Sequence, residues 1–231
     1  MFRVLTGISL AAGIAYLITG PWQPFAGSVW LKGMAMAPLA ALAFALAPKH
    51  GRPLAYLGIA LALSCAGDVL LDEDPSFFTF GLAAFLLAHV EYATLWLLFR
   101  PRPFRTTPQR SVVALIVIVS AVALGSWLAP GLGPLAAPVA LYIFAITTMV
   151  VSATVSRFPP GVFLGAVLFF VSDSVLALDK FKTHVPGRDW IVWSTYYFGQ
   201  FLIAVTAMRV LSRDTLRAGD PNVRHLTTHS S

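Results

Sequence analysis

The chain has 231 residues, of which 58% are apolar and only 11% are charged, and its formal net charge is +6. A soluble domain carries about 25% charged residues, so this composition excludes an ordinary soluble domain and a disordered chain. The single cysteine, Cys65, cannot form an intrachain disulfide, which also excludes a disulfide scaffold. The composition is typical of a protein that is embedded in lipid.

Eight apolar runs of membrane-spanning length follow one another along the chain, since a spanning helix needs about 20 predominantly apolar residues. The runs are residues 3–20, 30–47, 53–71, 76–99, 110–129, 134–155, 160–178 and 189–211. The sequence therefore predicts an all-α polytopic membrane protein, with a single domain over residues 1–211 that is a bundle of eight transmembrane helices. Residues 212–231 are polar and are predicted to form a mobile tail.

The distribution of Lys and Arg residues predicts the orientation in the membrane, because short cytoplasmic loops are enriched in positive charge. Twelve of the sixteen fall on one side: Arg3, Lys49, Arg52, Arg100, Arg102, Arg105, Arg110, Arg157, Arg209, Arg213, Arg217 and Arg224. Three fall on the other side (Lys180, Lys182 and Arg188), and Lys32 lies within a predicted helix. Both termini are therefore expected in the cytoplasm, and the acidic loop Asp72–Pro75 outside. In a bacterium the membrane would be the plasma (inner) membrane. The basic residues form no compact face, so nucleic acid is not an expected partner.

Five titratable side chains fall inside the predicted helices: Lys32, Asp68, His89, Glu91 and Asp173. Such groups are costly at membrane depth and mark functional sites. Lys32, Asp68 and Asp173 lie near the outer ends of their helices, so they are predicted to line one cavity. His89 and Glu91 lie deeper and are two residues apart, so at most one of them is expected to face that cavity.

Polar side chains at helical spacing accompany these residues. One predicted helix face carries four residues: Gly81, Phe85, His89 and Tyr92. In the last helix, Tyr196 and Gln200 are four residues apart and share a face. The alternative interpretation of His89, Tyr196 and Gln200 is a set of interhelical hydrogen bonds, which are common in membrane bundles. For Lys32 the alternative is that its ammonium group reaches the nearby interface.

The two aspartates occur in matched local sequences, Gly67-Asp68-Val69-Leu70-Leu71 and Ser172-Asp173-Ser174-Val175-Leu176. Aspartate is a poor helix former, and its short side chain cannot reach far toward water. A purely structural alternative is a pair locked to Lys32. The matched depth and sequence favour a functional role for both carboxyl groups.

The sequence resembles the YhhN-like family of integral membrane proteins, whose characterised members are lysoplasmalogenases. The matching blocks are Ala66–Leu71, Phe80–His89 with Tyr92, Gly165–Phe169 with Ser172, Asp173 and Phe181, and Thr195–Tyr197 with Gln200; Lys32 also fits. The blocks extend from the third predicted helix to the eighth, so the resemblance covers most of the chain. Glu91 is not part of the family's pattern.

The resemblance implies hydrolysis of the vinyl ether bond of a lysoplasmalogen, giving a fatty aldehyde and a glycerophospho-base. Such a reaction needs a proton donor and an anion near the developing cation, as in glycoside hydrolysis. Asp68 and Asp173 are the candidate acid/base pair, and His89 is the third catalytic candidate. Four further residues would bind or orient substrate or water: Lys32, Tyr92, Tyr196 and Gln200. No metal or other cofactor is expected, and the expected partners are a lysophospholipid and the bilayer, with no obligate protein partner.

Two other classes of function remain open at this point. A proton-coupled transporter would use the buried carboxyl groups, but it needs access from both sides of the membrane. The inner halves of the second, third and seventh predicted helices are almost purely Ala, Leu, Val and Phe, which disfavours a continuous path. A non-enzymatic membrane protein would use the same charges only to hold its helices together.

Overall fold

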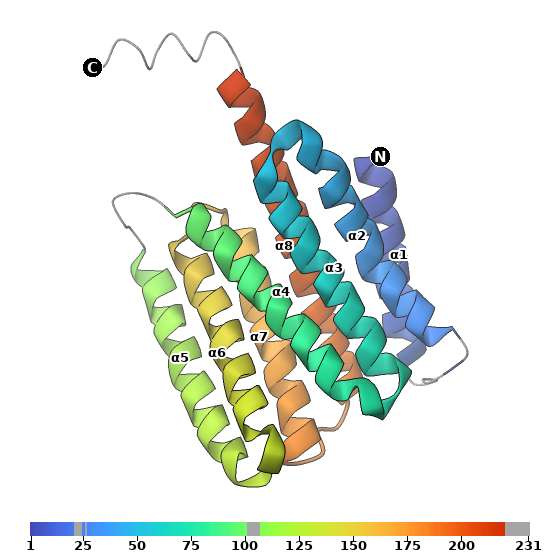
Figure 1. Ribbon diagram of the computed structural model, residues 1–231, viewed down its shortest axis with the longest axis vertical. Coiled ribbons are helices and arrows are strands. Elements are labelled where there is room, and N and C mark those ends of the chain that lie inside the picture. The colour runs from blue at the N-terminus through green and yellow to red at the C-terminus, as the bar shows by residue number, and fades with distance from the viewer. Residues whose placement is uncertain (21–24, 26, 101–106, 220–231) are drawn as a thin grey trace.

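The computed structural model describes residues 1–20, 25, 27–100 and 107–219, with side chains as far as Arg213. These residues form eight long helices and no strand (Figure 1). The helices are α1 (Phe2–Thr19), α2 (Ser28–His50), α3 (Arg52–Glu73), α4 (Phe78–Leu98), α5 (Pro108–Leu128), α6 (Ala136–Val155), α7 (Pro160–Phe181) and α8 (Arg188–Gly219). Three short 3₁₀ helices lie in the connections: η2 (Pro75–Phe77), η3 (Ala129–Gly131) and η4 (Gly133–Leu135). All eight long helices are long and apolar enough to cross a membrane, so the predicted fold is confirmed.

Two predicted boundaries differ from the structure. The acidic stretch after Leu71 is not all loop, because α3 continues through Glu73 and so includes Asp72. The helix ends at Asp74, whose extended backbone (φ −154°, ψ 141°) is the conformation favoured before a proline. Helix α8 runs to Gly219, beyond the predicted end at residue 211, and the remainder of the predicted tail, 220–231, lies outside the described residues.

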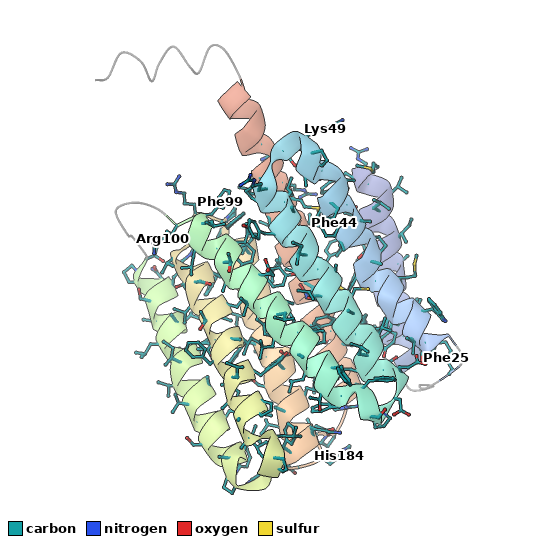
Figure 2. The ribbon with its side chains drawn as sticks, viewed as in Figure 1. Phe25, Phe44, Lys49, Phe99, Arg100 and His184 are labelled. Atoms are coloured by element: carbon teal, nitrogen blue, oxygen red, sulfur yellow. The ribbon has the colours of Figure 1, made fainter. Side chains whose placement is uncertain are left out.

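The N-terminus and the C-terminal end of α8 lie at the same end of the bundle (Figure 1). Lys49 and Arg100 lie at this end, which we call the basic end, and His184 lies at the opposite end (Figure 2). At the basic end, the Arg110 guanidinium donates to the carbonyls of Ser156 and Phe158, at 3.3 and 3.2 Å. Lys49, Arg100 and Arg110, which the sequence assigns to one side of the membrane, thus lie at one end of the bundle.

Glycines allow the closest helix contacts around the centre of the bundle. In α7, a Cβ on Gly165 would lie 2.5 Å from the carbonyl oxygen of Gly199 in α8. Between α3 and α4, a Cβ on Gly81 would lie 2.7 Å from the Leu71 side chain, and one on Gly67 would lie 2.6 Å from the Phe85 ring. Membrane helices use small residues in this way to bring backbones together. Gly81 and Gly67 thus allow α3 and α4 to approach closely.

The half of the bundle nearer the basic end is filled mainly by apolar side chains. On α2 and α3, Leu39, Leu42, Leu54, Leu57 and Leu61 are completely buried. The halves of α2 and α3 nearer the basic end are therefore mainly apolar.

Candidate active site

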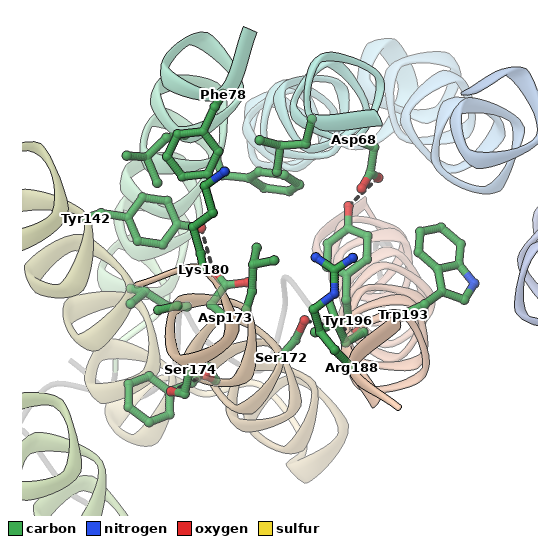
Figure 3. Close-up of a pocket in the computed structure, with 18 of the residues that line it drawn as sticks. Asp68, Phe78, Tyr142, Ser172, Asp173, Ser174, Lys180, Arg188, Trp193 and Tyr196 are labelled. Carbon is green, nitrogen blue, oxygen red and sulfur yellow. Dashed lines mark hydrogen bonds between the residues drawn. The ribbon is translucent and has the colours of Figure 1, made fainter. Parts of the chain in front are cut away.

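A pocket of about 310 Å³ lies between the helices in the half of the bundle opposite the basic end. Each of the eight helices contributes at least one side chain to its lining. Lys32, Asp68 and Asp173 are among them, as the depth argument predicts. Figure 3 shows Asp68 and Asp173 on different helices, facing the same pocket. The position of each residue along its helix predicts its depth in the membrane. The packing of α2, α3 and α7 then brings the three residues to one pocket.

Asp68 lies on α3 and is held by a tyrosine of α8. Its side chain is 2% exposed, and its Oδ2 accepts a hydrogen bond of 2.6 Å from the Tyr196 hydroxyl (Figure 3). The Tyr196 ring meets the Phe85 ring edge-on, with centroids 5.6 Å apart, and packs similarly on Phe169. These contacts fix the position of the hydroxyl group. Tyr196 therefore belongs to the pocket, next to a candidate catalytic carboxyl group.

Asp173 lies on α7 and faces two polar groups from other helices. Its Oδ2 accepts a hydrogen bond of 2.5 Å from the hydroxyl of Tyr142 on α6. The Nε2 atom of His89, on α4, lies 3.4 Å from the same oxygen and 3.1 Å from the Tyr142 hydroxyl. Because that hydroxyl already donates to Asp173, the geometry favours a histidine that donates through Nε2–H. Asp173, Tyr142 and His89 thus form one connected group.

His89 is completely buried, and it shares its buried face of α4 with Gly81, Phe85 and Tyr92, as the helical spacing predicts. It does not line the pocket itself, and it reaches the pocket only through Asp173 and Tyr142. Its Nδ1 has no hydrogen-bond partner among the described residues. Of the two titratable residues on this helix, only His89 is connected to the pocket. Glu91 is absent from the lining, and its Oε2 has no partner within the described part of the chain.

Lys32 contacts neither of the two candidate aspartates. Its Nζ lies 3.4 Å from Oδ1 of Asp72, which also accepts a hydrogen bond of 2.9 Å from the Tyr16 hydroxyl. The ammonium group also lies over the rings of Tyr16 and Trp193, at 5.6 and 5.8 Å from their centroids. The structural alternative, in which Lys32 forms an ion pair with Asp68 and Asp173, is therefore not what the structure shows. The ion-pair partner of Lys32 is Asp72.

Tyr92 and Gln200 form a second buried network that does not line the pocket. The Tyr92 hydroxyl donates to Oε1 of Gln200 at 2.6 Å, and Nε2 of Gln200 donates to the Ser64 hydroxyl at 2.8 Å. All three side chains are fully buried, and they join α4, α8 and α3. Direct contact of these two residues with substrate, expected from the sequence, has no support in this geometry. They hold the helices that carry Asp68, Tyr196 and His89.

Sequence reasoning missed three kinds of residue that line the pocket. The sequence predicts a loop at Asp72, and it gives no reason to select Tyr142 within its apolar segment. It predicts Lys180 and Arg188 only as charged residues of a loop, although both line the pocket. The spacing of Asp68 and Asp72, four residues apart on one helix, is the signal that could have identified Asp72.

The side of the pocket formed by α4, α5 and α6 is apolar except for Tyr142. It comprises Phe78, Leu82, Phe85, Ala121, Leu124, Val139, Ile143 and Ile146. The charged residues of the lining come from other helices, α2, α3, α7 and α8. The pocket is therefore amphipathic, with an apolar surface large enough to take part of an alkyl chain beside two carboxyl groups. Within the described residues, no group of three or more His, Cys, Asp or Glu side chains is arranged to hold a metal ion.

Comparisons with known proteins identify related chains. The YhhN family model matches residues 28–207. A protein of Mycobacterium bovis named lysoplasmalogenase is 33% identical, over 87% of this chain and 84% of its own length. Lysoplasmalogenase TMEM86B of Rattus norvegicus is 32% identical, over 90% of this chain and 84% of its own length, and the Homo sapiens protein of that name is 31% identical over 74% and 71%. No solved structure matches the chain significantly. The match to the family model covers most of the chain, which therefore belongs to the YhhN family.

Proposed function

We propose that this protein is a membrane-embedded lysoplasmalogenase, which hydrolyses the vinyl ether bond of a lysoplasmalogen to a fatty aldehyde and a glycerophospho-base. The observation that carries the proposal is the pair of carboxyl groups, Asp68 and Asp173, in one amphipathic pocket. The relatives named lysoplasmalogenase cover most of the chain and support the same reaction.

The reaction needs one group that gives a proton and one anion that stabilises positive charge. Protonation of the outer alkene carbon leaves positive charge on the carbon bonded to the ether oxygen. The oxygen of a water molecule bonds to that carbon and loses a proton to the anion. In the resulting hemiacetal the bond between carbon and the glycerol oxygen breaks, and that oxygen takes a proton. The hemiacetal hydroxyl loses its proton at the same time and becomes the carbonyl group of the aldehyde, so no net proton is consumed. Two carboxyl groups in different environments supply both roles.

We assign the proton donor to Asp68 and the anion to Asp173. Asp173 faces both the Tyr142 hydroxyl and the Nε2 of His89, and hydrogen bonds donated to a carboxylate stabilise its ionised form. Among the described residues, hydrogen bonds to Asp68 involve Oδ2 alone, which leaves Oδ1 for the substrate. His89 and Tyr142 then act by orienting Asp173, and Tyr196 orients Asp68.

The test is aldehyde release by purified protein from a lysoplasmalogen and from its saturated ether analogue. We expect aldehyde from the first substrate only, because a saturated ether offers no carbon to protonate. In D₂O the aldehyde should carry one deuterium on the carbon next to its carbonyl group. Equal inertness toward both substrates would contradict the proposed function.

We also propose that the basic end of the bundle faces the cytoplasm, so that the pocket opens toward the other face of the membrane. The support is the positive charge at that end, where Lys49 and Arg100 lie (Figure 2). In a bacterium the membrane would be the plasma (inner) membrane. A reporter enzyme active only outside the cytoplasm, fused after residue 231, should remain inactive.

The apolar side of the pocket should bind the alkenyl chain, and Ala121 on α5 should limit its length. Ala121 is buried and lines the pocket, so Ala121→Phe should fill part of the chain site. We expect kcat/KM to fall about tenfold for a long-chain substrate, and less for a short-chain one. The control is Ala123→Phe, because Ala123 is exposed on the same helix. An equal fall for both chain lengths would contradict a role in chain selection.

A further inference from the structure

The charged residues of the pocket differ in how they are neutralised. Lys32 is paired with Asp72, at 3.4 Å. Arg188 is paired with Asp179, at 3.5 Å, and with Asp189. In the described part of the chain, no carboxylate oxygen lies within ion-pair distance of Lys180. Lys180 is therefore a cation of the pocket that no acidic side chain neutralises.

The Lys180 side chain is exposed, and its ammonium group is held at the pocket by an aromatic ring. Its Nζ lies 4.8 Å from the centroid of Phe78, a cation–π contact that leaves all three N–H donors available. Figure 3 shows Lys180 beside Phe78, and Arg188 on another side of the same pocket. An anion between them would meet one free cation and the guanidinium of another residue.

Lys180 shares a face of α7 with Asp173. The two residues are seven positions apart, which is about two turns or 10 Å along the helix. Asp173, Ala177 and Lys180 all line the pocket, as expected for residues at i, i+4 and i+7. Lys180 precedes the last residue of α7, so it lies closer to the end of the bundle than the two carboxyl groups do.

We propose that Lys180 binds the phosphodiester of the lysolipid substrate. The inference rests on the proposed function and names the part of the site that holds the head group. Along α7, Lys180 lies about 10 Å beyond Asp173, toward the end of the bundle. In a lysoplasmalogen the three glycerol carbons separate the vinyl ether from the phosphate. A vinyl ether at the carboxyl groups therefore places the phosphate toward Lys180, with the alkenyl chain free to lie on the apolar surface of α4 to α6. Lys32, which the sequence predicts to bind or orient substrate or water, is already paired with Asp72.

The test compares Lys180→Gln with Lys182→Gln, a matched variant two residues further along the chain. Lys182 donates to the Trp127 carbonyl at 3.2 Å and does not line the pocket. Two substrates are used: a lysoplasmalogen and the corresponding 1-alkenylglycerol, which has the vinyl ether but no phosphate. For Lys180→Gln we expect KM for the lysoplasmalogen to rise about tenfold with kcat little changed, and the alkenylglycerol to be unaffected. Lys182→Gln should resemble the unmodified protein with both substrates.

Inhibition by small phosphate compounds shows whether the site binds a lipid phosphodiester or free phosphate. Glycerophosphocholine should inhibit the unmodified protein competitively, more strongly than Lys180→Gln, and inorganic phosphate should not. Inhibition by inorganic phosphate that depends on Lys180 would show that the site binds free phosphate and not the lipid phosphodiester, and it would overturn the inference. Equal effects of Lys180→Gln on both substrates, or an equal effect of Lys182→Gln, would also overturn it.

Binding of the saturated ether analogue of the lysolipid, measured without turnover, keeps this inference separate from the proposed function. The analogue should bind the Lys180→Gln protein about tenfold more weakly than the unmodified protein. Absence of turnover with unchanged weakening by Lys180→Gln would contradict the proposed function alone. Equal binding by the two proteins would contradict the phosphate site alone.

Discussion

Asparagine at position 68 or 173 is expected to lower kcat for vinyl ether hydrolysis by a factor of about 1000 or more, while the bundle stays folded. An amide of the same shape can still accept the hydroxyl hydrogen bond from Tyr196 or Tyr142. It cannot give up a proton to carbon, and it carries no negative charge. Positioned proton transfer alone contributes about 100- to 10,000-fold to enzymatic rates. The measurement is aldehyde release by each purified variant.

The matched control for these variants is Asp74→Asn, outside the membrane-spanning segments. Hydrogen bonds from the Ser76 side chain and from the Ser76 backbone amide, the latter at 2.8 Å, lower the pKa of the Asp74 carboxyl group. Asparagine caps a helix about as well as aspartate, so folding and turnover should both be retained. Thermal unfolding of all three variants in detergent shows whether each is folded. Turnover that survives in folded Asp68→Asn or Asp173→Asn protein would exclude that residue as a catalytic acid or base.

Much of the architecture could be predicted because lipid imposes a simple rule on the sequence. Each spanning segment must be long and apolar, so eight runs predict eight helices. The same rule makes every charge within a run conspicuous, and Lys32, Asp68 and Asp173 stand out for that reason. Their depth follows from the helix rise, which is why one shared pocket could be expected before the helices were placed in space.

The pairing of these charges could not be predicted, because it depends on which helices are neighbours and how each is rotated. Tyr142 is uncharged and costs little in an apolar segment, so nothing in the sequence singles it out. Its position between His89 and Asp173 follows only from the packing of α4, α6 and α7. Asp72 is followed by Glu73 and Asp74 in a run typical of a loop, but α3 extends two residues beyond Leu71 and places Asp72 against Lys32.

Asp72 changes how the basic residues are understood. An isolated lysine near the outer end of a helix suggests a phosphate ligand, but a lysine already held by a carboxylate and two aromatic rings has lost that availability. The cation that remains available is Lys180, which in the sequence indicates only the orientation of the chain in the membrane. The pairing of Lys32 with Asp72 thus favours a head-group site at the end of α7 over one on α2.

Gly165→Val should produce the largest loss of stability, because it forces apart the helices that carry Asp173 and Tyr196. A Cβ at position 165 would lie 2.5 Å from the Gly199 carbonyl oxygen and 3.1 Å from the Ile203 amide nitrogen, which are both backbone atoms of α8. A flexible side chain could turn away, but a helix backbone cannot yield without moving the whole helix. Overpacking a well-packed core costs about 1–3 kcal/mol, and occasionally more. We expect Tm to fall by roughly 10 °C or more.

Gly7→Val is the matched control, because a Cβ on Gly7 of α1 meets nothing within 4 Å. Its Tm should stay within a few degrees of the unmodified value, and its turnover should be unchanged. Any Gly165→Val protein that remains folded should have lower kcat as well, since separation of α7 from α8 moves Asp173 away from the hydroxyl of Tyr196 that holds Asp68. An unchanged Tm for Gly165→Val would show that α7 and α8 do not approach as closely as the structure places them, and the spacing of the two carboxyl groups would then have to differ too.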